Sequence, residues 1–139
     1  MLVYRLELKK KDDQSVGGGI YWDSIEYEGY NCIGNYLTNQ GDIEKHPLPS
    51  DDPLLSPVWE WLKDKEYHRE YIFCFKSYDQ LKNWFYLYPD RLQKVKEDDN
   101  VHIGIYQVDD EFYYKGQFQS IAKKDCMILV DSWELGFEP

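Results

Sequence analysis

Basic residues are scarce in this sequence of 139 residues. Lys and Arg number 16 against 26 Asp and Glu, which gives a formal net charge of −10. Because attraction to phosphates supplies most of the nonspecific affinity of nucleic-acid-binding proteins, this charge argues against direct binding to DNA or RNA. The acidic residues are spread over both halves of the chain. Such acidity either keeps the surface solvated or suits it to a basic, nucleic-acid-binding cleft on another protein.

Long apolar runs and paired cysteines are also missing. No stretch approaches the ~18 consecutive apolar residues of a membrane span, and no basic segment leads into an apolar run as in a signal peptide. Cys32, Cys74 and Cys126 form an odd set without CxxC spacing, which favours reduced thiols over disulfides. We therefore expect a cytoplasmic protein.

Aromatic residues, in contrast, are abundant. They make up 17 % of the chain, with 5 Trp, 13 Tyr and 6 Phe. A chain so rich in aromatic side chains can bury a core, and its length suits one domain. We expect residues 1–139 to form a single globular domain with a long irregular segment at 23–55.

The first predicted element is a strand over residues 2–8. Its apolar and polar residues alternate with period two, which places Arg5 and Glu7 on one face, away from Leu2 and Leu6. Further apolar runs predict more strands. The other predicted strands are 20–22, 71–75, 101–108, 112–121 and 126–130.

Two main helices are predicted, at about 57–67 and 78–88. The first has Ser56 as its cap and proline at the first helical position, and Pro89 ends the second. Strands outnumber helices, and the helices lie in the middle of the chain. The predicted class is α+β, with a mostly antiparallel or mixed sheet.

Motifs of metal and nucleophilic chemistry are missing. The chain has three histidines, His46, His68 and His102. Their spacing does not resemble a metal site, so we expect no bound metal. No P-loop, GxSxG or HExxH pattern occurs. Cys74 lies in a predicted buried strand, where a thiol is inert, and Ser77 forms a capping box with Gln80.

Tyrosines and acidic clusters are the candidate contact residues. Tyrosine offers a large, stiff surface with a polar tip, which is typical of protein-binding surfaces. The alternative is an irregular aromatic core beneath the long loop. The candidate residues are Tyr21, Tyr27, Tyr30, Tyr36, Asp51, Asp52, Asp109, Asp110 and Glu111.

Several segments together resemble a family of small phage and prophage proteins of unassigned role. The segments, as they stand here, are Tyr4-Arg5-Leu6-Glu7 with Gly19-Ile20-Tyr21, His46-Pro47-Leu48-Pro49 with Asp51-Asp52, Phe73-Cys74-Phe75-Lys76-Ser77 with Gln80-Leu81 and Trp84-Phe85, and Tyr106-Gln107-Val108 with Gly116-Gln117-Phe118-Gln119. The resemblance covers about residues 3 to 121 in order. It implies a phage origin and supplies no activity.

A second resemblance is to mono-ADP-ribosyltransferases of the Arg–Ser–Glu type. Arg5, Ser77 and Gln119 stand in the order of that family's Arg, Ser and final Glu. The resemblance implies that Arg5 would bind NAD, that Ser77 would support the site, and that position 119 would face the ribosyl cation. A neutral amide replaces the carboxylate there, which removes most of the electrostatic stabilisation of that cation. The resemblance thus implies a degenerate copy, or one that uses another carboxylate such as Glu111.

Two hypotheses about function follow. The first is a phage-encoded acidic accessory protein that needs no cofactor and acts in the host cytoplasm. It would bind and inhibit or redirect a host protein, such as an antiviral defence component, in an anti-CRISPR-like or other counter-defence role. The second is an NAD-dependent mono-ADP-ribosyltransferase, or a nucleotide-binding relative of one, with Arg5, Ser77 and Gln119 in its cleft.

Overall fold

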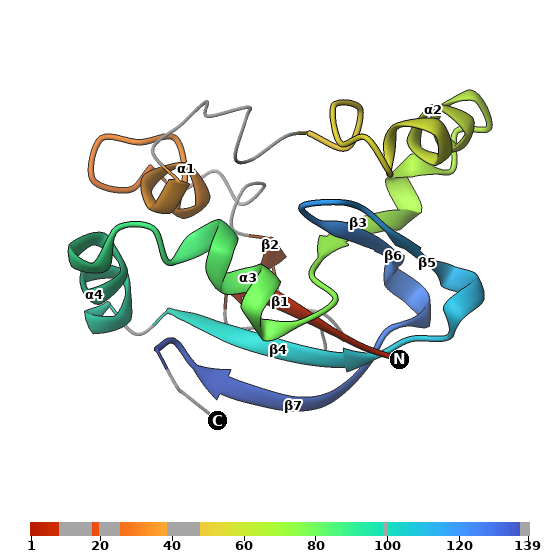
Figure 1. The fold of residues 1–139 in the computed structure, drawn as a ribbon. Helices are drawn as coiled ribbons and strands as arrows, with labels where there is room; N and C mark the ends of the chain where they lie inside the picture. The colour runs from red at the N-terminus through yellow and green to blue at the C-terminus, as the bar shows by residue number, and fades with distance from the viewer. Residues whose placement is uncertain (9–17, 20–25, 39–47, 99, 137–139) are drawn as a thin grey trace.

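Two antiparallel sheets and four helices make up the part of the chain that the computed structural model describes, residues 1–8, 18–19, 26–38, 48–98 and 100–136 (Figure 1). The larger sheet has the strand order β2-β1-β4-β7, and the smaller has the order β3-β6-β5. The strands are β1 (Leu2–Leu8), β2 (Gly18–Gly19), β3 (Tyr71–Cys74), β4 (Val101–Gln107), β5 (Tyr113–Lys115), β6 (Ser120–Lys123) and β7 (Ile128–Glu134). The helices are α1 (Ile33–Thr38), α2 (Ser56–Asp64), α3 (Tyr78–Phe85) and α4 (Pro89–Glu97). The predicted α+β class is confirmed.

The two sheets meet at β1. Tyr4 and Phe75 exchange two backbone hydrogen bonds of 2.8 Å, so the end of β3 lies beside the first half of β1. The second half of β1 pairs with β2, and its other edge pairs along its whole length with β4. This arrangement makes β1 the strand that joins both sheets.

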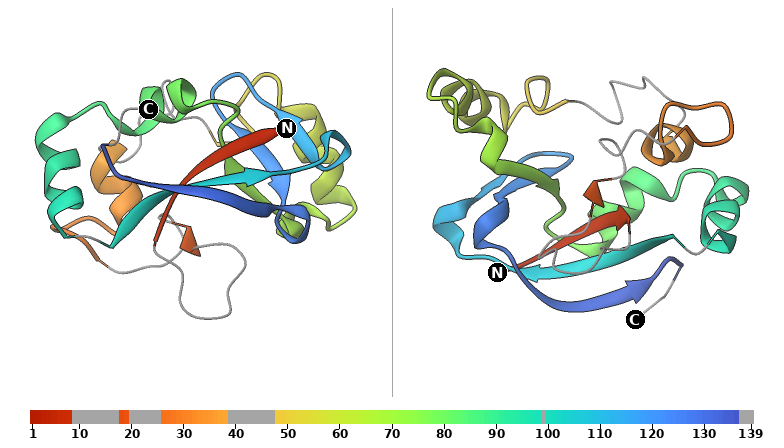
Figure 2. Two further views of the ribbon diagram at one scale, coloured as in Figure 1. Left: turned by 90° about the horizontal axis from the view of Figure 1, so that it is seen from below. Right: turned by 180° about the vertical axis from the view of Figure 1, so that it is seen from behind.

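Three apolar clusters fill the layers of the fold. On one face of the larger sheet, Leu6 and Ile103 pack under α1, α3 and α4. Between the two sheets lie Val3, Cys74 and Tyr106. A third cluster of Leu55, Leu62 and Ile121 joins α2 to the smaller sheet. Figure 2 shows the consequence, with α1 and α4 near one end of the molecule and α2 with the smaller sheet near the other.

The alternation predicted for β1 is present, and both of its faces are covered. Leu6 lies among the residues beneath the helices, whereas Arg5 and Glu7 share the opposite face, with Arg5 Nε 3.1 Å from Glu7 Oε2. Arg5 is 6 % exposed and Glu7 1 %. The face of β1 that carries Arg5 and Glu7 is therefore buried, although these two residues are charged.

Both predicted main helices exist, with different ends. α2 covers Ser56–Asp64, so Ser56 is helical and Leu55 takes the N-cap position without a side-chain cap bond. The prediction that Ser56 caps this helix was wrong. α3 ends at Phe85, and Pro89 begins a further helix, α4. Proline fits the first turn of a helix because its missing N–H has no partner there, and so it starts α4 as well as separating it from α3.

The cap at Ser77 is confirmed, in a modified form. Ser77 Oγ accepts the N–H of Gln80 at 3.1 Å. The Gln80 side chain reaches back to the N–H of Lys76, at 3.0 Å, instead of the N–H of the cap residue. Two backbone donors at the start of α3 are thus satisfied, as a capping box requires.

Other boundaries also differ from the prediction. The predicted strand 112–121 is two strands, β5 and β6, joined by a turn, and β6 continues to Lys123. The last strand is Ile128–Glu134. Within the segment 23–55 the structure describes helix α1, which the sequence pattern did not indicate. The predicted strand 20–22 and two parts of that segment, 23–25 and 39–47, lie outside the described residues.

Candidate functional site

A buried cluster of charged and polar side chains connects β1 to β4. The Glu7 carboxylate accepts hydrogen bonds from Arg5 Nε (3.1 Å) and from Tyr106 OH (2.7 Å), and its Oε1 lies 2.8 Å from His102 Nε2. Arg5 also donates to the carbonyl oxygen of Phe73 on β3, at 2.8 Å. The cluster therefore ties together three strands from both sheets.

The electrostatics of this cluster favour a charged Glu7. Burial alone would raise the pKa of Glu7, but His102, the Arg5 charge and Tyr106 outweigh burial and hold that pKa below its ordinary value of 4.5. Gly104 makes room for the carboxylate, since a Cβ at this position would collide with Glu7 and with the ring of Tyr106. We interpret the cluster as a structural tie that fixes the register of β1 against β4.

Arg5, Ser77 and Gln119, the residues of the ADP-ribosyltransferase hypothesis, lie around the end of β3. Arg5 contacts β3 through Phe73 O, and Ser77 begins α3 shortly after the strand ends. Gln119 is 2 % exposed and precedes Ser120, which pairs with Cys74 of β3. The guanidinium of Arg5 is engaged by Glu7 and by the Phe73 carbonyl, so binding to NAD would require it to exchange these partners.

Asp52 is an interior residue, and its predicted role in a contact surface was wrong. It is fully buried. Its carboxylate accepts the backbone N–H groups of Leu54, Leu55, Gln117 and Phe118 at 2.9–3.3 Å. A buried carboxylate is stable when backbone donors surround it, and here it joins the segment before α2 to the turn before β6. Its neighbour Asp51 is exposed.

Three of the predicted contact tyrosines come together beside α4. Tyr36 of α1 lies between Tyr27 and Tyr30, with ring centroids 5.0 and 5.5 Å apart and the rings edge to face. The guanidinium of Arg91 lies over the rings of Tyr30 (5.4 Å), Tyr36 (5.4 Å) and Tyr88 (4.8 Å). We call these four tyrosines and Arg91 the tyrosine patch.

The tyrosine patch is partly exposed. Tyr27, Tyr30 and Tyr36 are half-buried, and Tyr88 is 38 % exposed. Burial and the hydrogen bond of Tyr27 to Asp98 raise the pKa of the Tyr27 hydroxyl, so it stays protonated at neutral pH. The rings of the patch thus pack against one another and remain partly exposed, and their role in contacting a partner stays a prediction. Tyr21 lies outside the described residues.

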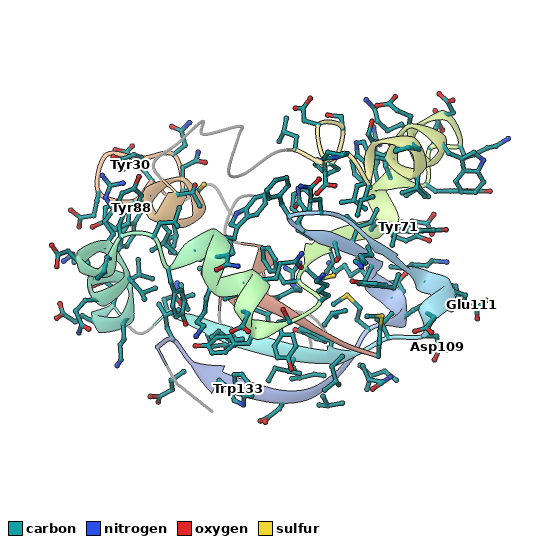
Figure 3. All side chains as sticks on the ribbon, in the orientation of Figure 1. Tyr30, Tyr71, Tyr88, Asp109, Glu111 and Trp133 are labelled. Carbon is teal, nitrogen blue, oxygen red and sulfur yellow. The ribbon has the colours of Figure 1, made fainter. Side chains whose placement is uncertain are left out.

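The predicted acidic contact residues lie at a distance from the tyrosine patch. Asp109, Asp110 and Glu111 are exposed around a 3-10 turn before β5. Figure 3 shows Asp109 and Glu111 near one end of the molecule and Tyr30 with Tyr88 near the other. The candidate contact residues therefore form at least two separate groups.

Several residues of these clusters were not nominated from the sequence. They are Glu7, His102, Tyr106, Tyr88 and Arg91. The pairing of β1 with β4, which places Glu7 opposite His102, has no local signal in either strand. Pro89 followed by charged residues is a typical helix start, so the sequence could have predicted α4 with Tyr88 and Arg91 at its beginning.

The structure also bears on reactive thiols, metal sites and membrane-spanning helices. All three cysteines are free, and burial raises the pKa of Cys74 to about 12, which makes its thiol unreactive. Among the described residues, no three His, Cys, Asp or Glu side chains gather as metal ligands would. Nor does any described helix combine the length and apolar character that a membrane crossing needs.

Comparison with known proteins places the chain in a family. A family model described as bacteriophage T4 Y00F protein matches residues 1–136. The chain belongs to this family. The match confirms the prediction of a phage protein, and the likeness to ADP-ribosyltransferases stays a prediction. No curated protein and no solved structure matches the chain.

Proposed function

We propose that this phage protein is an acidic accessory protein that binds and inhibits or redirects a host protein. The tyrosine patch is the observation that carries the proposal. Tyrosine and arginine are, with tryptophan, the residues enriched at the energetic centres of protein interfaces. Here the exposed ring of Tyr88 lies against the half-buried Arg91. The patch needs no cofactor and no metal for this role.

The charge of the chain indicates the kind of partner. A net charge of −10 repels nucleic acid and attracts a basic protein surface, and it speeds the encounter with such a surface at low salt. A host protein that itself binds nucleic acid offers such a surface. A component of an antiviral defence system is one such target, and its inhibition would be a counter-defence function in the host cytoplasm.

The test is affinity capture from host lysate with a matched pair of variants. Tyr88→Ser removes an exposed ring of the patch (38 %), and Tyr67→Ser removes a somewhat more exposed ring (49 %) near the end of α2. We expect the wild type and Tyr67→Ser to capture one dominant basic protein, and Tyr88→Ser to bind it at least ~10-fold more weakly. Equal capture by all three proteins, or no specific capture, would contradict the proposal.

A second candidate function is NAD-dependent mono-ADP-ribosyl transfer. The observation that favours it is the placement of Arg5, Ser77 and Gln119 around the end of β3. Its test is incubation of the protein and a host lysate with labelled NAD. Transfer of label that disappears with Arg5→Lys, in a variant shown to be folded, would establish this activity and refute a pure binding role.

A further inference from the structure

Strand β7 has an outer edge that no described strand covers. β7 pairs with β4 on one side, and among the described residues no strand pairs with its other side. Figure 1 shows it as the lowest strand of the molecule, and the rear view in Figure 2 agrees. A free sheet edge presents backbone N–H and C=O groups that an extended segment of another chain can pair with.

The side chains of β7 are unusually apolar for an exposed edge. Ile128 is 66 % exposed and Val130 is 53 % exposed. Val130 lies at the register shift between Ile105 and Tyr106 of β4, so this residue has no direct partner on that strand. Near the middle of β7, Asp131 Oδ1 accepts the N–H of Ser132, at 2.8 Å. Ile128–Val130 is therefore the apolar stretch of this edge that an added strand would contact.

A pocket adjoins the same strand toward its C-terminal end. It is lined by Lys96 of α4 together with Asp131–Gly136. Trp133, whose indole Nε1 donates to Asp131 Oδ2 at 3.1 Å, is among its lining residues. A chain paired with Ile128–Val130 would continue past this pocket and could place a side chain in it.

We infer that the outer edge of β7 binds an extended segment that carries Lys or Arg side chains and belongs to the basic host protein. The inference rests on the proposed function and specifies which part of the host protein this chain would bind. Both charged side chains of β7, Asp131 and Glu134, are acidic and exposed. They would attract basic side chains of the incoming strand, while Ile128 and Val130 would pack against its apolar ones.

Charge also selects this occupant over a second copy of the chain. Two copies that paired through β7 would bring together two molecules of charge −10, as well as Asp131 and Glu134 of each edge. Like charges across a strand pair destabilise it. A basic strand meets the same edge with attraction instead.

The direct test uses synthetic peptides of about ten residues, long enough to span the strand. One alternates Val with Lys, and a second alternates Val with Glu. A third is the first with proline in place of every second Val, which keeps the charge and removes backbone N–H donors. Binding is followed by fluorescence anisotropy of the labelled peptide, and the site by amide hydrogen exchange. We expect only the Val–Lys peptide to bind, with slowed exchange in Ile128–Val130.

Val130→Lys and Leu54→Lys are the matched variants. Each adds one positive charge at an apolar side chain that is about half exposed, 53 % and 55 %, and Leu54 lies outside β7. We expect Val130→Lys to weaken binding of the Val–Lys peptide at least ~10-fold and Leu54→Lys to leave it nearly unchanged. Circular dichroism should show both variants to be folded.

The outcomes separate this inference from the proposed function. Equal weakening by both variants, protection elsewhere in the chain, or self-association through β7 in analytical ultracentrifugation would overturn the inference. So would undiminished capture of the host protein by Val130→Lys. If Tyr88→Ser still lost capture in that case, the proposed function would stand without the β7 site.

Discussion

Replacing Glu7 with Gln tests whether the buried cluster between β1 and β4 holds the fold together. The substitution keeps the shape of the side chain and removes its charge. It leaves Arg5, which is 6 % exposed, without its carboxylate partner. In addition, the NH2 group of the new amide faces a donor, either Arg5 Nε or the Tyr106 hydroxyl, where a carboxylate oxygen accepted before. Breaking a buried ion pair on one side costs about 3–5 kcal/mol.

That cost is a large part of the stability of a domain, which is about 5–15 kcal/mol. The assay is urea unfolding followed by the fluorescence of the five tryptophans. With a slope of about 2 kcal/mol per M, the midpoint should fall by about 1.5–2.5 M urea. The control is Glu134→Gln, because Glu134 pairs across the sheet with His102 and is exposed, so its loss should change stability little.

The effect of Glu7 on stability should also depend on pH. The folded protein lowers the pKa of Glu7 below its ordinary value of 4.5, so the charged carboxylate contributes stability above that pH. The contribution disappears as the pH falls through the lowered pKa. The difference between wild type and Glu7→Gln should therefore shrink on acidification below ~4.5. A difference under about 1 kcal/mol at neutral pH, or one that grows in acid, would refute the reasoning.

Three further substitutions or reactions test other parts of the structure. Gly104→Ala should lower the free energy of unfolding by about 1–3 kcal/mol, because the added methyl group collides with Glu7; a neutral result in the urea assay would contradict this packing. Asp52→Asn should lower the free energy of unfolding by about 2–3 kcal/mol, because Asp52 accepts four backbone N–H groups. The control Asp51→Asn, at an exposed residue, should leave it unchanged. Similar unfolding midpoints for the two variants would contradict the buried role of Asp52. Cys74 should resist alkylation at about pH 8 until urea is added, because its pKa is raised to about 12; mass spectrometry would reveal labelling of the folded protein if this is wrong.

Local patterns predicted the elements that local physics determines. The period-two pattern of residues 2–8 correctly placed Arg5 and Glu7 on one face, and the Ser77 capping box correctly marked the start of α3. Such features depend on side chains a few residues apart in the sequence. For the same reason the α+β class and the central position of strand 101–108 followed from the sequence.

The clusters that unite distant segments could not be predicted in this way. Glu7 meets His102 because β1 pairs with β4, and Asp52 is buried because a turn more than sixty residues later supplies two of its donors. From the sequence alone Asp52 is one of many acidic residues. Tyr27, Tyr30 and Tyr36 were among the tyrosines nominated from the sequence, but only the fold shows that their rings meet one another and Arg91.

The most direct test of the binding proposal is the association rate of the captured host protein with this chain, measured by stopped-flow fluorescence at low and at high salt. An acidic surface that docks on a basic partner predicts a rate that falls at least ~10-fold as salt rises from about 0.02 M to 0.3 M. Tyr88→Ser should leave that salt dependence intact and speed dissociation. A rate that ignores salt, together with dissociation unchanged in Tyr88→Ser, would contradict the account.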